Sequence, residues 1–332
     1  MTPLKFALPA LVVCALLAGC QSNNKKTAED GEILMPKMQQ NTYLSHARAP
    51  QEFGFAAYPV GNGIGFQGTG HLHPNHMATV EFLKGKVPVI EMRGMSKRKK
   101  INMLLDTSSN ASWMEFINAE EFGAIFLGIE GKYVPYRGGY NTGGADAYAA
   151  VVKQMRINQL FIENTPLYVR MAMNSLGPMA RGIVKPTVEG VMGYDVMRNF
   201  EYIQFNLDQG AVQFSASIPY VPNEQHLMTK ARIVPQKDYG LAVEGAIFGT
   251  ATPIILDFAG DFHFVRSDAK VAITKQVSIG DIVYRKVPTM LYPVDETRAA
   301  QPLPRAGRRM LEDYVVTICP KLGLVYFERY SK

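Results

Sequence analysis

Short apolar runs separated by turn-forming residues dominate the chain from residue 77 onward. The clearest of them are residues 78–82, 87–92, 101–105, 151–157, 160–162 and 167–171. Glycine, lysine, asparagine or proline stands between most successive runs, which is typical of strands joined by turns. Short strands at this close spacing predict an all-β barrel or sandwich.

The pattern changes near Gly193. Val196, Met197 and Phe200 fall at helical spacing, so a short helix is expected just after the Gly193 turn. A pair of strand-like runs then occupies residues 202–214. This succession of turn, short helix and strand pair predicts the end of one folding unit.

The same order of patterns returns in the last third of the chain. Its parts are a hairpin-like segment at 241–249, an apolar run at 253–256, a turn segment at 306–314, and strand-like runs at 315–318 and 324–327. The repetition predicts two β-rich lobes, at residues 77–217 and 240–332, with a connection at 218–239. A length of 332 residues fits this, because domains average about 150 residues.

The first residues follow a different pattern, that of an export signal. Lys5 provides a positive charge, and residues 6–16 form an apolar stretch too short to span a bilayer stably. The stretch ends in 17–20, Leu-Ala-Gly-Cys, which resembles a bacterial lipobox. That resemblance implies a signal peptide at 1–19, cleavage before Cys20, and acylation of its thiol.

The lipobox changes the expected location of the protein. Gln21, rather than Asp, follows the modified cysteine. By resemblance to enteric lipoproteins, this favours the outer membrane. We therefore expect a lipoprotein of the bacterial cell envelope that faces the periplasm, with an acyl anchor that holds it stably on the membrane. Residues 20–76, polar and then glycine-rich, are expected to form the tether and an N-terminal extension.

Composition excludes several other classes of protein. A hydrophobic content of 47% is enough for sizeable cores, so the chain is not disordered. The net charge of +6 is scattered except at 97–100, which predicts a solvated hairpin tip and no nucleic-acid partner. Cys319 is the only thiol beyond the anchor, and its apolar strand predicts a buried core residue.

Histidines at 71, 73 and 76 are close in sequence, but Pro74 breaks helical spacing and no acidic or Cys partner stands nearby. An exposed loop is the simpler interpretation of this segment. We therefore expect no metal and no cofactor.

Candidate chemistry centres on Asp106. The apolar run 101–105 ends in this carboxylate, and Thr107, Ser108 and Ser109 follow at once. A carboxylate at the end of a buried strand lies where desolvation and a second carboxylate can change its acidity, as an aspartic peptidase requires. The same string also fits an ordinary Asx or ST turn.

The first lobe as a whole resembles a lobe of the retropepsin-like and pepsin-like aspartic peptidases, over about residues 77–217. The resemblance rests on Leu104 to Ser109, on a glycine-rich hairpin at 133–149, and on Val191-Met192-Gly193. It implies that Asp106 is catalytic and that Gly193 lies in the segment threaded through the ψ-loop. The flap implied by the resemblance contains Tyr136, Gly138, Gly139 and Tyr140. Ser108 departs from the family, which usually has glycine there.

An aspartic peptidase needs two carboxylates, because one acts as base toward water while the other donates a proton. Asp257, followed by Phe258, Ala259 and Gly260, ends the corresponding strand of the second lobe. Phe258 stands where the family has Thr or Ser, and Ala259 where it usually has Gly. The segment 305–307 also matches the family poorly. Asp257 could therefore complete the pair, be a relic, or be outcompeted by Asp261.

The sequence thus predicts an all-β protein of two retropepsin-like β-barrel lobes with a central cleft. The favoured function is a monomeric, membrane-anchored aspartic endopeptidase, a hydrolase that cleaves a peptide or protein substrate with Asp106 and Asp257. The alternative is a catalytically inactive lipoprotein that binds a peptide or an envelope ligand in the same cleft. A structural lipoprotein whose lobes mediate assembly is the third hypothesis.

Overall fold

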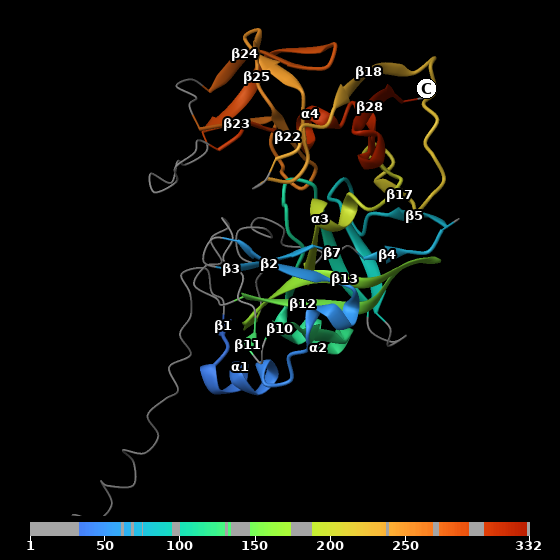
Figure 1. The fold of residues 1–332 in the computed structure, drawn as a ribbon. Coiled ribbons are helices and arrows are strands. Elements are labelled where there is room, and N and C mark those ends of the chain that lie inside the picture. The colour runs from blue at the N-terminus through green and yellow to red at the C-terminus, as the bar shows by residue number, and fades with distance from the viewer. Residues whose placement is uncertain are drawn as a thin grey trace, which may run out of the picture.

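The computed structural model describes residues 33–60, 63–67, 70–74, 76–94, 100–129, 132–133, 147–173, 188–236, 239–267, 272–291 and 302–330. Strands predominate over short helices in these ranges, which confirms the predicted all-β class. Figure 1 shows two β-rich regions, one mainly blue to green and the other orange to red. No helix within the described ranges is both long and apolar enough to cross a membrane.

A closed barrel of six strands, here called the first barrel, forms the larger region. Its strands are β6 (Val89–Gly94), β7 (Lys100–Asp106), β8 (Trp113–Glu115), β12 (Ala147–Ile157), β13 (Leu160–Arg170) and β15 (Gly190–Gly193). The order around the barrel is β13-β8-β15-β7-β6-β12, and pairing of β12 with β13 closes it. The chain between β8 and β12 adds α2 (Phe116–Phe122), β9 (Ala124–Phe126), β10 (Gly128–Ile129) and β11 (Lys132–Tyr133).

β12 and β13 correct one detail of the sequence prediction. Three short strands were expected between residues 151 and 171, but the chain forms a hairpin of two eleven-residue strands. Asn158 adopts a positive φ of 50° in the turn, and Asn164 adopts 49° within β13. Asparagine tolerates this left-handed conformation, so Asn164 is absorbed as an irregularity in the pairing and does not end the strand.

The second region is a sheet whose strands repeat that order, with the counterpart of β6 divided into two short strands, and it is here called the open sheet. Its strands are β19 (Ala242–Val243), β20 (Gly245–Ile247), β21 (Thr250–Ala251), β22 (Ile254–Asp257), β23 (Phe264–Arg266), β24 (Ile273–Ile279), β25 (Ile282–Leu291) and β26 (Arg305–Gly307). β19 and β20 together correspond to β6, but the strand is interrupted at Glu244. β19 therefore pairs with β22 and β20 with β24.

A six-stranded sheet, here called the shared sheet, takes strands from both halves of the chain. Its order is β18-β28-β27-β16-β17-β5. The strands are β5 (Met77–Glu81), β16 (Tyr202–Asn206), β17 (Ala211–Ser215), β18 (Leu227–Arg232), β27 (Tyr314–Cys319) and β28 (Leu324–Arg329). β16 pairs with β27, so the two halves meet at the middle of the sheet. β18 lies within the predicted connection at 218–239, which therefore contributes a strand that the sequence analysis did not predict.

Short helical turns complete these units. α3 (Tyr194–Met197) follows β15, as predicted, and α4 (Arg308–Leu311) follows β26 in the same way. A 3₁₀ turn, η3 (Pro320–Leu322), joins β27 to β28. Cys319 is buried at the end of β27, as predicted, and burial raises the pKa of its thiol to about 12. This thiol is a core group.

The N-terminal elements lie in the segment expected to form the tether and N-terminal extension, residues 20–76. They are β1 (Ile33–Leu34), α1 (Lys37–Leu44), η1 (Pro50–Phe53), β2 (Ala56–Val60), β3 (Gly63–Gln67) and β4 (His71–Leu72). β1 pairs with β14 (Ala172–Met173), and β4 pairs with β13. Met35, Leu44 and Phe53 are buried, so a few isolated apolar residues are enough to pack this segment onto the first barrel.

Candidate active site

Asp106 and Asp257 occupy equivalent places in the two sheets. Asp106 is the last residue of β7 and lies opposite Gly193 at the end of the parallel strand β15. Asp257 is the last residue of β22 and lies opposite Gly307 at the end of the parallel strand β26. The predicted repeat of strand, carboxylate and turn therefore has the same register on both sides.

Glycine is required beside each carboxylate. A Cβ atom added at Gly193 would lie 2.5 Å from the backbone oxygen of Ala111. One added at Gly307 would overlap the backbone oxygen of Phe262. Each strand thus passes directly against the turn that follows the aspartate strand, and a side chain would push the two apart.

The Asp106 carboxylate is held by the turn that follows it. Oδ1 of Asp106 accepts hydrogen bonds from the backbone N–H of Ser108 at 2.9 Å, its hydroxyl at 2.7 Å, and the backbone N–H of Ser109 at 3.2 Å. The aspartate is only 6% exposed. Thr107, Ser108 and Ser109 are buried around it. The predicted turn of small hydroxyl residues therefore fixes the direction of the carboxylate.

The Asp257 carboxylate has fewer backbone donors and a cation beside it. Its Oδ1 accepts from the N–H of Gly260 at 2.8 Å, and its Oδ2 lies 3.7 Å from Nη1 of Arg305. Asp257 is 5% exposed. Burial raises the pKa of Asp257 to about 6, and the negative charge of Asp106 acts in the same direction while Arg305 opposes it.

Backbone and hydroxyl contacts join the two turns. The Thr107 hydroxyl donates to the carbonyl of Leu256 at 2.6 Å and accepts from the N–H of Phe258 at 3.4 Å. The segment leading into β19 is also bound to the first turn, because Gly240 N–H donates to the Ser108 carbonyl at 3.0 Å. The structure thus brings the aspartate turns of the first barrel and the open sheet together.

Phe258 forms a different link from the one that Thr107 makes. Its ring stacks on Phe205 of β16, with centroids 4.1 Å apart and planes at 15°. Both side chains are fully buried. Where the resemblance would place a second hydroxyl, the chain instead packs its turn against the shared sheet.

Asp261, the alternative partner for Asp106, is engaged elsewhere. Its carboxylate lies 2.9 Å from Nε of Arg309 and 3.0 Å from Nη2 of Arg308. These contacts, with Arg309 first, hold the pKa of Asp261 below its usual range. The side chain is 59% exposed, so this carboxylate belongs to the surface of the open sheet. Asp257 is the carboxylate that the structure brings to Asp106.

Sequence reasoning missed the role of Arg305. It lies in β26 opposite Ile255, two residues before Asp257 on the neighbouring strand. Besides its contact with Asp257, Nη1 of Arg305 donates to the Ser108 hydroxyl at 3.4 Å. The available signal was a charged residue two positions before Gly307 in a segment where the family has apolar residues.

Sequence reasoning also missed a partly buried carboxyl beside the glycine-ended strand that pairs with the Asp106 strand. Asp195 in α3 accepts from the Ser112 N–H at 3.0 Å and the Ser112 hydroxyl at 2.7 Å. That hydroxyl in turn accepts from the Gly193 N–H at 2.9 Å. Burial raises the pKa of Asp195 to about 6, although the hydrogen bonds from Ser112 act in the opposite direction. The acidic residue in the first turn of α3 was the available signal.

Several predicted site residues lie outside the described ranges. They are Cys20 and the flap residues Tyr136, Gly138, Gly139 and Tyr140. Their assignments stay predictions. Within the described ranges, no group of three or more His, Cys, Asp or Glu side chains is placed to hold a metal ion.

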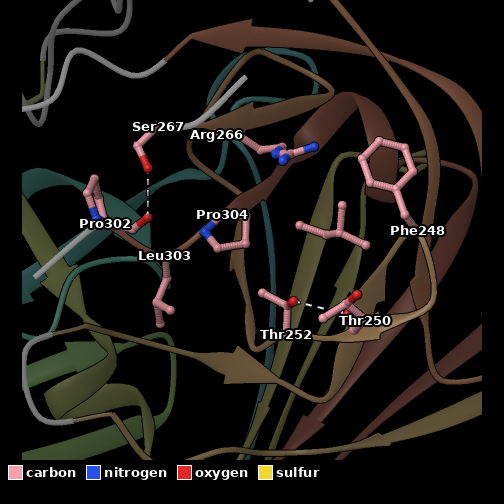
Figure 2. A pocket seen from close by; sticks show the side chains of 9 residues that line it. Phe248, Thr250, Thr252, Arg266, Ser267, Pro302, Leu303 and Pro304 are labelled. Carbon is pink, nitrogen blue, oxygen red and sulfur yellow. Dashed lines mark hydrogen bonds between the residues drawn. The ribbon is translucent and has the colours of Figure 1, made fainter. Parts of the chain in front are cut away.

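A pocket of about 450 Å³ lies on the open sheet (Figure 2). It is lined by Ile247, Phe248, Thr250, Thr252, Arg266, Ser267, Pro302, Leu303 and Pro304. The Arg266 guanidinium lies 5.5 Å from the centre of the Phe248 ring. Neither Asp106 nor Asp257 is among the residues that line this pocket.

The chain matches no protein-family model, and no curated protein sequence matches it significantly.

Proposed function

We propose that this protein is an aspartic endopeptidase in which Asp106 and Asp257 activate water for attack on a peptide carbonyl. The observation that carries the proposal is geometric: two nearly buried aspartates end equivalent strands, and the Thr107 hydroxyl binds the two turns to each other. Like charges this close cannot both ionise cheaply, so the pair tends to hold one proton. That state contains both the base and the acid that peptide hydrolysis needs.

The two carboxylates are suited to different roles. Asp106 is fixed by three hydrogen bonds to one oxygen, which orients it as the base toward water. Asp257 has a pKa raised to about 6 and is the side on which the shared proton is retained. In the proposed reaction Asp106 removes a proton from water, and Asp257 protonates the peptide group as the carbonyl is attacked.

The repeated topology supports the two-lobe interpretation. In the first barrel, the aspartate strand β7 pairs in parallel with β15, and β15 pairs antiparallel with β8. In the open sheet, β22 pairs in parallel with β26, and β26 pairs antiparallel with β23. Both regions then supply three strands to the shared sheet. We therefore interpret the first barrel and the open sheet as retropepsin-like lobes. One chain supplies both carboxylates, so the proposed enzyme acts as a monomer.

The proposed setting is the bacterial cell envelope, with a lipid anchor at Cys20 and periplasmic peptides or proteins as substrates. Changing Cys20 to Ser removes the thiol that would be acylated. The variant is expected to leave the membrane fraction that the wild type occupies, and unchanged membrane partitioning would remove the anchor from the proposal.

Arg305 favours a second candidate function, a binding protein without hydrolysis. Its guanidinium lies 3.7 Å from Asp257 and opposes the rise in the pKa of that carboxyl. A cation there favours the doubly ionised pair, which lacks the acid for hydrolysis. The same charged site would still bind a peptide or an envelope ligand.

A peptide-library cleavage assay from acid to neutral pH separates the two candidates. Asp106→Asn and Asp257→Asn keep the shape of each side chain but remove a proton carrier, so cleavage is expected to fall about 10²–10⁴-fold. Asp261→Asn is the matched control and is expected to retain activity. Cleavage that survives Asp257→Asn would replace the pair by two Asp106 sites from two copies. A folded wild type that cleaves nothing favours the binding protein.

A further inference from the structure

A chain of polar contacts crosses the candidate site from Asp257 to Asp106. Nη1 of Arg305 lies 3.7 Å from Oδ2 of Asp257 and 3.4 Å from Oγ of Ser108. The same hydroxyl donates to Oδ1 of Asp106 at 2.7 Å. Arg305 and Ser108 are both departures from the family pattern, and they contact each other at the carboxylate pair.

The position of Arg305 makes its charge effective. Only 14% of its side chain and 7% of that of Asp257 are exposed, so water screens the interaction weakly. An opposite charge within about 4–6 Å typically lowers the pKa of a carboxyl by 1–3 units. Surface ion pairs of the same composition have much smaller effects.

The charge balance of the site suggests what this cation does. Two carboxylates that share one proton carry a net charge of −1, and two ionised carboxylates beside one guanidinium carry the same net charge. The cation can therefore compensate the pair without the proton. A pair arranged in this way loses its shared proton at a lower pH than one without the cation.

We propose that Arg305 is a positioning residue that sets the upper pH limit of the aspartate pair, with Ser108 carrying part of its effect to Asp106. This inference rests on the proposed function and adds a form of regulation to it. The enzyme is active in acid, where the pair holds one proton, and is switched off towards neutral pH as Arg305 stabilises the doubly ionised pair.

The other charged groups near the pair do not take this role. On the turn after β22, Asp261 is paired with Arg308 and Arg309. On the side of the first barrel, Asp195 is bound by Ser112. Asp106 raises the pKa of Asp257, as burial does, and Arg305 is the cation that acts in the opposite direction.

The test follows the titration of the aspartate carboxyl carbons by NMR in the folded full-length protein, alongside the pH profile of kcat/KM. Arg305→Gln removes the charge but keeps hydrogen-bond donors, and Arg305→Lys keeps the charge. Arg309→Gln is the matched control, because it neutralises an arginine four positions away that pairs with Asp261. Melting curves of each variant establish that it is folded.

Arg305→Gln is expected to raise the pKa of Asp257 and the upper limit of the pH profile by about one unit. Arg305→Lys and Arg309→Gln are expected to titrate as the wild type does. Ser108→Ala is expected to raise the pKa of Asp257 and the upper pH limit by less than Arg305→Gln does, because the Ser108 hydroxyl also lowers the pKa of Asp257. Because Ser108 and Arg305 are in contact, the two changes are expected to be non-additive in the double variant.

An unchanged titration in Arg305→Gln overturns the inference, as does an equal shift in Arg309→Gln. A purely structural Arg305 would lower the melting temperature but leave the titration in place. If the wild type cleaves nothing while Arg305→Gln still shifts the titration, the proposed hydrolysis fails and the charge effect of Arg305 stands.

Discussion

The turns around Asp106 and Asp257 have the same backbone plan and different side-chain support. Both aspartates end a strand that is paired in parallel with a glycine-ended strand. Asp106 is held by three donors from its own serine turn, whereas Asp257 has one donor from its own turn, the Gly260 N–H, and is supported from outside by the guanidinium of Arg305 and the Ser108 hydroxyl. A fold can therefore preserve the position of a carboxylate while part of its hydrogen bonding is exchanged for a charge.

The residues that follow the aspartates show the same contrast. Thr107 binds the opposite turn through its hydroxyl, and Phe258 binds the shared sheet through its ring. The first contact is directional and fixes the distance between the turns. The second is apolar and adds buried area. The comparison thus shows that the contact of Thr107 positions the two turns, whereas the contact of Phe258 stabilises the fold.

Removing the apolar contact is expected to have the largest effect on stability. Phe258→Ala empties a fully buried position and removes the stack on Phe205, so the free energy of unfolding is expected to fall by about 3–5 kcal/mol. Phe248→Ala is the control, because that ring is 53% exposed. Denaturant unfolding measures both. A loss below about 1 kcal/mol for Phe258→Ala would remove the structural role assigned to this ring.

The pH dependence of stability sharpens the contrast between the carboxylates. Because the pKa of Asp257 is raised to about 6 in the folded protein, its protonated form stabilises the fold at low pH. That stabilisation is lost as pH rises from the unfolded pKa of about 4 through about 6, and it amounts to about 2–3 kcal/mol.

Asp257→Asn removes this contribution. Stability of the variant is therefore expected to fall less between acid and neutral pH than that of the wild type, as measured by urea unfolding at a series of pH values. The pKa of Asp195 is also raised to about 6, so the free energy of unfolding of the variant is still expected to fall somewhat as pH rises. Equal slopes in wild type and variant would show that Asp257 titrates as an ordinary surface carboxyl.

Breaking the polar contact is expected to have a smaller effect. Thr107→Val keeps the shape of the side chain but removes the hydroxyl that donates to the Leu256 carbonyl, at a cost of about 1–2 kcal/mol. Thr250→Val is the control, because Thr250 is exposed. If Thr107 fixes the geometry of the pair, kcat falls by more than this loss of stability explains. Wild-type kcat in the variant would make the contact a purely stabilising one.

The sequence predicted the parts of this comparison that are local. Residues 101–109 and 191–197 contain a strand, a turn and a short helix whose signals lie within a few positions, and both carboxylate turns were found in this way. The contact of Arg305 with Asp257 and the stack of Phe258 on Phe205 each join residues that are about fifty positions apart in the sequence. Both contacts depend on which strands become neighbours in the fold. Such contacts are set by tertiary pairing and leave no local signal.

The N-terminal elements and the long β12–β13 hairpin escaped sequence analysis for a similar reason. Residues 33–53 show little periodicity, and isolated apolar residues such as Met35 and Leu44 pack on the first barrel. Asn164 was interpreted as a turn because asparagine is common in turns, but pairing of β12 with β13 holds it within a strand. In both cases tertiary packing outweighs the local preference.

The most direct test of the central claim is an NMR titration of the aspartate carboxyl carbons in the wild type and in Asp106→Asn. Because the charge of Asp106 contributes to the raised pKa of Asp257, the account predicts a step near pH 6 in the wild type. That step moves to lower pH when Asp106 is neutralised. The same Asp257 step in both proteins would contradict the account, because the two aspartates would then be separate groups and not one catalytic pair.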